Sequence, residues 1–204
     1  MAMTRPRIWN RRRFIFAGVL MPAAVVFGGW SRLPAYAAGV LEPTPACGDA
    51  EVTPQQTAGP FFKPDSPERA SLIEPEIQGQ RLVLEGLVLS TRCTPVANAL
   101  VDLWHADADG RYDNQGFRLR GHQYTDADGR YAFETIVPGM YGPRTRHCHV
   151  KVQAPGRPVL TTQLYFPGEK RNATDFLFRP DLLMTVSQVE TKGHGRFDFV
   201  LDLS

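Results

Sequence analysis

Two histidines separated by one residue, His147 and His149, are the first residues of this sequence that suggest chemistry. Successive side chains of a strand alternate between its faces, so both imidazoles would leave the same face and could bind one metal ion. Tyr141 lies six residues upstream, and Tyr112 follows an Asp-Gly turn. A tyrosine binds metal as a phenolate, so its ordinary pKa of about 10 must fall, which a trivalent iron ion favours. Together the four residues indicate a ferric site.

Other interpretations of these residues stay open at this point. Copper or zinc could use the two histidines, although zinc more often takes cysteine, histidine or carboxylate ligands. The histidines could instead be half-buried residues without a metal, and Tyr112 alone is typical of a core tyrosine beside a turn. The metal site is indicated only when all four residues are taken together.

The elements that would position these residues are predicted to be strands. Runs rich in apolar and β-branched residues, or alternating with polar ones, predict strands at 81–89, 100–105, 131–136, 147–152, 160–166 and 197–203. A helical turn is expected only near 172–178. Short strands about ten residues apart, with Gly and Pro in the turns, are typical of a sandwich. We expect an all-β protein: a β-sandwich of short antiparallel strands with an extended N-terminal arm.

Two near-copies of one turn interrupt these strands. Asp107-Ala-Asp-Gly110 and Asp126-Ala-Asp-Gly129 are each followed by Arg-Tyr. Asp-Gly sequences are typical of hairpin turns, which is our prediction for both. Calcium binding is not expected, because an EF-hand loop needs a third carboxylate and a distant Glu.

The first segment, residues 1–37, has the features of a twin-arginine signal peptide. Paired arginines lie in Asn10-Arg-Arg-Arg-Phe-Ile15, an apolar stretch continues to about Trp30, and Ala35-Tyr-Ala37 is a small-residue cleavage site. A membrane anchor is the alternative, but the stretch is short and contains Pro22. We expect export to the periplasm or medium, with membrane contact only during export. Residues 38–80 would then form the arm, rich in Pro, Thr and Gly at its start, and residues 81–204 the β-sandwich domain that carries the candidate site.

The charge balance argues against a nucleic-acid partner. The formal net charge is +2, but the charged residues before residue 38 are six arginines. The remainder has 17 basic and 21 acidic residues, a net charge of −4. Such a balance does not favour a phosphate backbone. The hydrophobic content of 43% is that of one globular domain.

The three cysteines, Cys47, Cys93 and Cys148, include no Cys-x-x-Cys pair, so a thiolate zinc site is not expected. An oxidising compartment favours one disulfide. Strand alternation would turn Cys148 away from its flanking histidines and into the packed sheet. Cys47 and Cys93 are therefore the candidate pair, and two unpaired buried thiols are the alternative.

A longer set of motifs resembles one enzyme family. The motifs are Thr53-Pro-Gln-Gln-Thr-Ala-Gly-Pro-Phe-Phe62, Pro95 to Tyr112, Thr125 to Tyr131, Pro138-Gly-Met-Tyr141, Arg144-Thr-Arg-His-Cys-His149 and Thr161-Thr-Gln163. With them the chain resembles the intradiol ring-cleavage dioxygenases, nonhaem ferric enzymes that include protocatechuate 3,4-dioxygenases and catechol 1,2-dioxygenases. Thr145 stands where the family usually has proline, and Cys148 where it has an apolar residue. Neither departure removes a ligand.

The resemblance implies the composition of the site. One Fe(III) per chain would be held by four residues, of which Tyr141 and His149 are axial: Tyr112, Tyr141, His147 and His149. Arg144 would face the substrate ring and stabilise negative charge on it, and Gln163 would lie near the substrate. A surface ion pair for Arg144 and an ordinary polar strand position for Gln163 are the alternatives. Three arm residues would approach the substrate: Thr57, Gly59 and Pro60.

The resemblance also implies the reaction. A catecholic small molecule would be opened with O2 between its two hydroxyls to a cis,cis-muconate-type product, and Tyr141 would take up a substrate proton. The alternative is a metal-free transthyretin-like β-sandwich that only binds a ligand. Such a module has no reason to keep the two tyrosines and two histidines together. Neither the particular catechol nor the oligomeric state follows from the residues.

Overall fold

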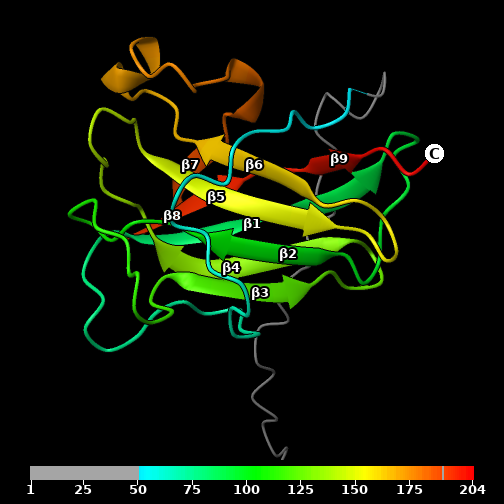
Figure 1. The fold of residues 1–204 in the computed structure, drawn as a ribbon, viewed down its shortest axis with the longest axis horizontal. Helices are drawn as coiled ribbons and strands as arrows, with labels where there is room; N and C mark the ends of the chain where they lie inside the picture. Colours follow the sequence, from blue (N-terminus) through cyan, green and yellow to red (C-terminus); the bar gives the residue numbers. More distant parts are fainter. Residues whose placement is uncertain (1–50, 190) are drawn as a thin grey trace, which may run out of the picture. The chain divides into compact units, whose positions relative to one another are not determined.

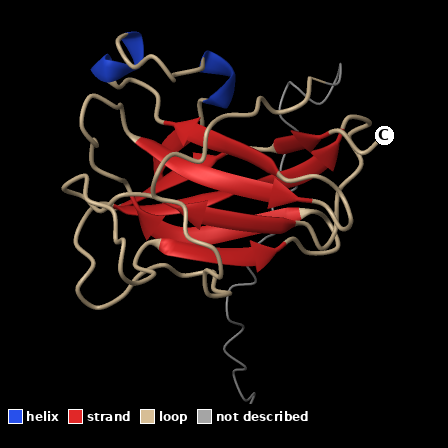
Figure 2. Ribbon diagram, viewed as in Figure 1, coloured by secondary structure: helices blue, strands red, loops and turns tan. Residues whose placement is uncertain are grey.

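The computed structural model describes residues 51–189 and 191–204, in which nine strands form two packed sheets (Figures 1 and 2). One sheet has the order β3-β2-β5-β6, and the other has the order β4-β1-β8-β7 with β9 also paired to β1. The strands are β1 Arg81–Ser90, β2 Leu100–Trp104, β3 Arg120–Tyr124, β4 Arg130–Ile136, β5 His147–Gln153, β6 Leu160–Tyr165, β7 Thr185–Val189, β8 Lys192–Arg196 and β9 Phe199–Leu201. The predicted all-β sandwich is confirmed.

The hydrophobic core joins the two sheets. Val101 and Leu103 of β2 and Val150 of β5 belong to one buried cluster with Leu84 of β1 and Phe133 of β4. Because side chains alternate along a strand, the intervening residues of β2 and β5 take the other face of their sheet. That outer face is available for a site.

The arm covers this outer face. The Gln56 N–H donates to Thr161 O of β6 (2.8 Å), and the ring of Phe62 lies 5.0 Å from that of Trp104 in β2. The chain then reaches β3, where the His122 N–H donates to Pro67 O (3.0 Å). Figure 1 shows the segment, in cyan, crossing the sheet. In the part that is described, the arm is thus an extended strip held by hydrogen bonds and aromatic contacts.

Three strands were not predicted, and two pairings are parallel. Segments 120–124 and 192–196 are polar or glycine-rich and lack an apolar alternation, so only their sheet partners make them strands. In β8, a Cβ on Gly195 would lie 3.4–3.8 Å from Met184, Leu82 and Leu84, which fill the space beside it. Segment 185–189 forms β7 by pairing with β8. Five of the seven pairings among the described strands are antiparallel, as expected, whereas β1 pairs in parallel with β8 and β9.

Both Asp-Gly turns form, but neither is a hairpin. The Gly110 N–H donates to Asp107 O (3.1 Å) and the Gly129 N–H to Asp126 O (3.0 Å), with φ of +82° and +73° at the glycines. The second turn connects β3 and β4, which belong to different sheets, and the first leads from β2 into a loop. The two turns could be predicted from the sequence. Which sheet the chain joins after each turn could not.

Helical structure in the described residues is limited to two 3-10 turns, η2 Lys170–Ala173 and η3 Pro180–Leu182. The helical turn predicted near 172–178 overlaps only the end of η2. No helix in residues 51–189 or 191–204 is long and apolar enough to cross a membrane. The predicted signal peptide, residues 1–37, and the start of the arm lie outside the described residues.

Candidate active site

The two candidate histidines lie on the outer face of the β3-β2-β5-β6 sheet. Within β5, Cys148 and Val150 belong to the core cluster, so His147 and His149 take the opposite face. His149 pairs across the sheet with Trp104 of β2, and their rings stack at 5.0 Å. The predicted orientation of Cys148, a free and fully buried thiol, is confirmed.

Two loops bring the candidate tyrosines to the same place. A Cβ on Gly110 would lie 2.1 Å from Met140 O, so the two loops can approach this closely only with glycine there. The rings of Tyr112 and Tyr141 are consequently 5.6 Å apart. Phe61 of the arm stacks on Tyr112 at 4.4 Å and meets Tyr141 edge-on at 5.1 Å. The three rings form one aromatic cluster beside the histidines.

A buried arginine ties the arm to the loop that carries Tyr112. Arg120 is 2% exposed, and it donates from Nη1 to Phe61 O (2.6 Å) and from Nε to Asp113 O (3.0 Å). The preceding residue, Leu119, has φ +54°, a left-handed conformation that is rare for leucine. This strained backbone leads into the arginine that holds Phe61 against Tyr112.

His147 presents an unprotonated nitrogen to the site. His147 Nδ1 lies 2.7 Å from Thr145 O, and since a carbonyl only accepts, Nδ1 carries the proton and Nε2 has the lone pair. That Nε2 is 3.2 Å from Tyr112 Oη. Burial lowers the pKa of His147 to about 4 and that of His149 well below its ordinary value. Both imidazoles are therefore neutral at pH 7.

These donors fit a ferric ion. His149 Nδ1 is buried and has no hydrogen-bond partner in the described residues. Burial also raises the pKa of Tyr112, so its phenol ionises only next to a strong positive charge, which a trivalent ion would supply. Within residues 51–189 and 191–204 no three His, Cys, Asp or Glu side chains gather as a metal-binding group. Tyr112, whose Oη lies 3.2 Å from His147 Nε2, places an oxygen atom beside the histidines.

A cavity of about 460 Å³ opens beside the four residues, within the range of about 300–1,000 Å³ typical of small-molecule pockets. Its lining comes from the arm, two loops, β5 and the segment after η2: Thr57, Gly59, Pro60, Phe61, Tyr112, Tyr141, Pro143, Arg144, His147, His149, Phe176 and Leu177. The four predicted ligands, Arg144 and the three predicted arm residues thus border one cavity. At Gly59, with φ +65°, a Cβ would come within 3.3 Å of His149 Cε1, so the arm approaches this histidine closely.

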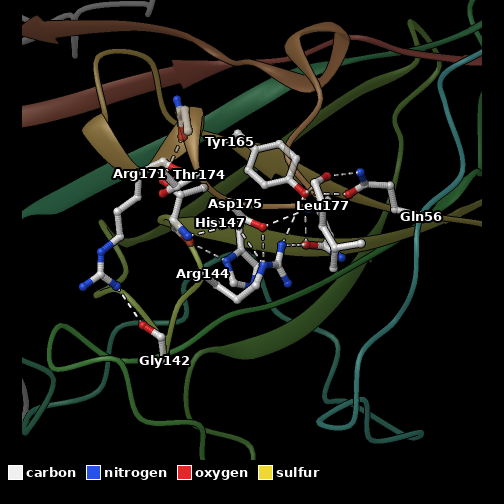
Figure 3. A network of polar contacts seen from close by, with 12 residues as sticks. Gln56, Gly142, Arg144, His147, Tyr165, Arg171, Thr174, Asp175 and Leu177 are labelled. Carbon is white, nitrogen blue, oxygen red and sulfur yellow. Dashed lines mark hydrogen bonds and ion pairs between the residues drawn. The ribbon is translucent and has the colours of Figure 1, made fainter.

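Arg144 is held in a polar network at the cavity wall (Figure 3). Its Nε donates to both carboxylate oxygens of Asp175 (2.9 and 2.8 Å), and its Nη2 donates to Gln163 Oε1 (2.6 Å) and Tyr165 Oη (3.3 Å). Burial by itself would raise the pKa of Asp175, but hydrogen bonds from the Leu177 N–H, Arg144 and the Thr145 N–H lower it. The pair is therefore ionised at neutral pH, and Arg144 is not a surface ion pair.

Gln163 lies behind this network rather than in the cavity lining. It is fully buried, accepts from Arg144 and donates from Nε2 to Thr57 O (2.9 Å). The amide therefore links the arginine to the arm. Its predicted contact with substrate stays a prediction.

Several residues of the site were missed from the sequence. Phe61 was quoted only as part of the arm motif, and Pro143, Phe176 and Leu177 carried no signal. Asp175 follows η2 in a segment whose position beside β5 is set by tertiary contacts, since the Thr145 N–H donates to its Oδ2 (2.9 Å). Nothing in the sequence indicated that Asp175 is the partner of Arg144.

The structure tests the predicted disulfide only in part. Cys93 is disulfide-bonded, but Cys47, its predicted partner, lies outside the described residues. Cys93 has φ +57° in the turn after β1. The Cys47–Cys93 pairing stays a prediction.

The known proteins that this chain resembles in sequence are dioxygenases. Residues 58–203 match the family model described as "Dioxygenase". Over 172 residues the chain is 34% identical to catechol 1,2-dioxygenase 2 of Acinetobacter lwoffii, covering 71% of this chain and 62% of that protein. It is 35% identical over 152 residues to the protocatechuate 3,4-dioxygenase beta chain of Burkholderia cepacia, covering 60% and 65%. The chain thus spans less than two thirds of the length of these curated relatives.

Solved structures agree in fold. The dioxygenase domain of a dioxygenase carbohydrate-binding protein fusion from the cellulolytic bacterium Streptomyces sp. SirexAA-E is 56% identical, with a TM-score of 0.74, covering 76% of this chain and 100% of that one. The 3-chlorocatechol 1,2-dioxygenase of Rhodococcus opacus 1CP is 28% identical, with a TM-score of 0.68, covering 73% and 72%. The metal-free binding module is not favoured by these relatives.

Proposed function

Because this chain belongs to the intradiol ring-cleavage dioxygenase family, we propose that it opens a catecholic ring between its two hydroxyl-bearing carbons with O2. The observation that carries this proposal is the convergence of two tyrosines, two neutral histidines and an arginine on one cavity. The expected product is a cis,cis-muconate-type acid. The relatives include catechol and protocatechuate enzymes, and they support the reaction class rather than one substrate.

We propose that one Fe(III) is held by Tyr112, Tyr141, His147 and His149. When bound, the ferric ion would supply an electron acceptor that makes the catechol ring reactive toward dioxygen. The proposal is supported by the unprotonated His147 Nε2, the unpartnered His149 Nδ1 and the two phenols at the cavity. Copper or zinc on the same histidines is less suited to the two tyrosines.

The protein side chains would orient the substrate and handle its protons. Tyr141 is 40% exposed at the cavity, so its Oη can meet an entering substrate and accept a hydroxyl proton. Arg144 borders the same cavity and would stabilise negative charge on the ring, as preorganised donors do in other enzymes. Its bonds to Asp175 and Gln163 hold the guanidinium in place before substrate arrives. Phe61 and the arm residues Thr57, Gly59 and Pro60 would shield the ring from water.

We further propose export by the twin-arginine route to the periplasm or medium. The support is the sequence of residues 1–37. That route carries folded proteins, so metal could be loaded before export. A Cys47–Cys93 disulfide suits the same compartment.

The experiment combines colour, metal content and oxygen uptake. The purified protein should contain one iron per chain, absorb visible light as ferric phenolates do, and consume oxygen with catechols, giving muconate absorbance. His149→Ala should lose nearly all its iron, because a lost ligand opens the site. A colourless protein that consumes no oxygen would contradict the proposal, and full iron occupancy in His149→Ala would remove this residue from the ligand set.

A further inference from the structure

The cavity offers no unpaired charge to a substituent on the substrate. Of its lining residues in the described part of the chain, Arg144 is the one side chain with a formal charge apart from the candidate metal ligands, and no carboxylate borders the cavity. That charge is balanced by Asp175, whose side chain is fully buried and accepts from Arg144 Nε at 2.9 and 2.8 Å. An anionic substituent would lose its water here without gaining an unpaired cation, which is unfavourable.

The rim of the cavity is apolar. Phe176 borders the cavity and is 80% exposed, the highest value among the large hydrophobic residues exposed in the described chain. Pro60, Pro143 and Leu177 border the same cavity. An exposed phenyl ring next to a pocket gains burial when the apolar part of a ligand covers it. The rim therefore suits a hydrophobic group that projects beyond the catechol ring.

Phe176 stands on an anchored turn. The Leu177 N–H donates to Asp175 Oδ1 (3.0 Å), and the Phe178 N–H donates to Asp175 O (3.0 Å). Leu177 O accepts from Gln56 Nε2 (2.6 Å) and from Tyr165 Oη (2.8 Å), contacts that Figure 3 shows. Asp175, whose carboxylate holds Arg144, thus also fixes the backbone after Phe176 through that carboxylate and through its own carbonyl. The surface offered to a substituent is preformed.

We propose that the natural substrate is a catechol with an uncharged apolar substituent, an alkyl or aryl group, and that Phe176 is the residue that selects it. Carboxylated catechols are disfavoured by the same cavity. This inference rests on the proposed ring cleavage and names its substrate class.

The test compares two catechols that carry different groups at the same ring position. Oxygen uptake gives kcat/KM for 4-tert-butylcatechol, 3,4-dihydroxybenzoate and unsubstituted catechol, and anaerobic calorimetry gives Kd, which does not depend on the chemical step. The wild type should favour 4-tert-butylcatechol over 3,4-dihydroxybenzoate at least about tenfold in both measurements, as hydrophobic pockets discriminate by roughly 10- to 200-fold. In Phe176→Ala, the ratio of 4-tert-butylcatechol to catechol should fall about tenfold. Tyr124→Ala removes another exposed aromatic ring that does not border this cavity, and should leave the ratio unchanged.

The outcomes separate this inference from the proposed function. Oxygen uptake with catechol together with a preference for 3,4-dihydroxybenzoate would overturn the substrate class and leave ring cleavage intact. Equal ratios in Phe176→Ala and Tyr124→Ala would overturn the role of Phe176. If the iron-containing protein consumes none of the three compounds, the proposed function fails and the inference with it.

Discussion

The same six-residue sequence, Asp-Ala-Asp-Gly-Arg-Tyr, occurs twice in this protein and has two outcomes. At 107–112 and at 126–131 the first aspartate accepts from the N–H groups two and four residues later, at 2.9 and 2.8 Å in both copies. The turns are thus alike in their bonding. Tyr112 nevertheless borders the cavity, whereas Tyr131 is 2% exposed in the core.

The surroundings of the two hydroxyls explain the difference. Tyr112 Oη lies 3.2 Å from His147 Nε2, and Tyr131 Oη donates to Phe197 O at 2.7 Å. Burial raises the pKa of both phenols. Only Tyr112 has a metal-binding group beside it, so a local sequence determines a turn but not the role of the tyrosine that follows.

The largest expected effect is on Tyr112. Tyr112→Phe keeps the ring against Phe61 but removes the oxygen, so turnover should fall more than about 100-fold, beyond the loss typical of a group that only supports a ligand. The visible band should change, and the free energy of unfolding should move by less than about 1 kcal/mol. Steady-state kinetics, absorption spectra and urea unfolding check this. Full activity with an unaltered spectrum would show that Tyr112, like Tyr131, does not bind the metal.

The buried ion pair between Arg144 and Asp175, at the wall of the cavity that Tyr112 borders, should have a large effect on stability. Asp175→Asn breaks a buried pair and should cost on the order of 3 kcal/mol. The pKa of Asp175 is lowered in the folded state, so its contribution is present above the ordinary aspartate pKa of about 4 and is lost as pH falls through the lowered value. Urea unfolding of both proteins should therefore differ more at pH 6 than at pH 3. A constant difference would contradict the assignment.

Substitution of the two turn glycines should distinguish a loss of stability alone from a loss of stability that also disturbs the active site. Gly110→Ala puts a Cβ 2.1 Å from Met140 O, next to Tyr141, whereas Gly129→Ala puts one 2.8 Å from Val88 O in β1. Each should lose about 1–3 kcal/mol of stability from strain at positive φ. Only Gly110→Ala should also lower kcat/KM per folded iron-containing molecule, because the loop with Tyr141 must move. Equal kinetic losses in the two variants would argue against this.

Tyr131→Phe is the counterpart of the first substitution. It leaves Phe197 O without its donor, so stability should fall by about 1 kcal/mol. Iron content and kcat should stay at wild-type values. Calorimetric unfolding together with metal analysis checks both, and a loss of iron would show that the core tyrosine is coupled to the site.

The smallest effect is expected for the arginines of the two turns. Arg111 pairs with Asp107 and Asp109, and Arg130 pairs with Asp126 and Asp128, in solvent-accessible positions. Arg111→Ala and Arg130→Ala should each change stability by less than about 0.5 kcal/mol, since exposed pairs contribute little. Thermal unfolding measures this. A larger loss in one of them would reveal a difference between the turns that their bonding does not show.

The sequence predicted those strands whose apolar residues are the ones buried in the core. The runs at 81–89, 100–105, 131–136, 147–152 and 160–166 predicted β1, β2, β4, β5 and β6, because their apolar residues are the ones that the core takes up. Strands β3, β7 and β8 were missed, since polar and glycine-rich segments gain strand structure from neighbours rather than from their own residues. The parallel pairings of β1 likewise depend on chain segments more than 100 residues apart.

By itself, the sequence determined the alternation in β5 that separates His147 and His149 from Cys148, and the turns that precede Tyr112 and Tyr131, because both follow from local backbone geometry. The tertiary structure alone decided which tyrosine meets the histidines, that Asp175 pairs with Arg144, and that Phe176 stands at the rim. These contacts join residues that are far apart in the chain. They exist only after the sheets pack and the arm crosses the outer face. The free energy of that packing depends on contacts across the whole domain, so no short stretch of residues predicts it.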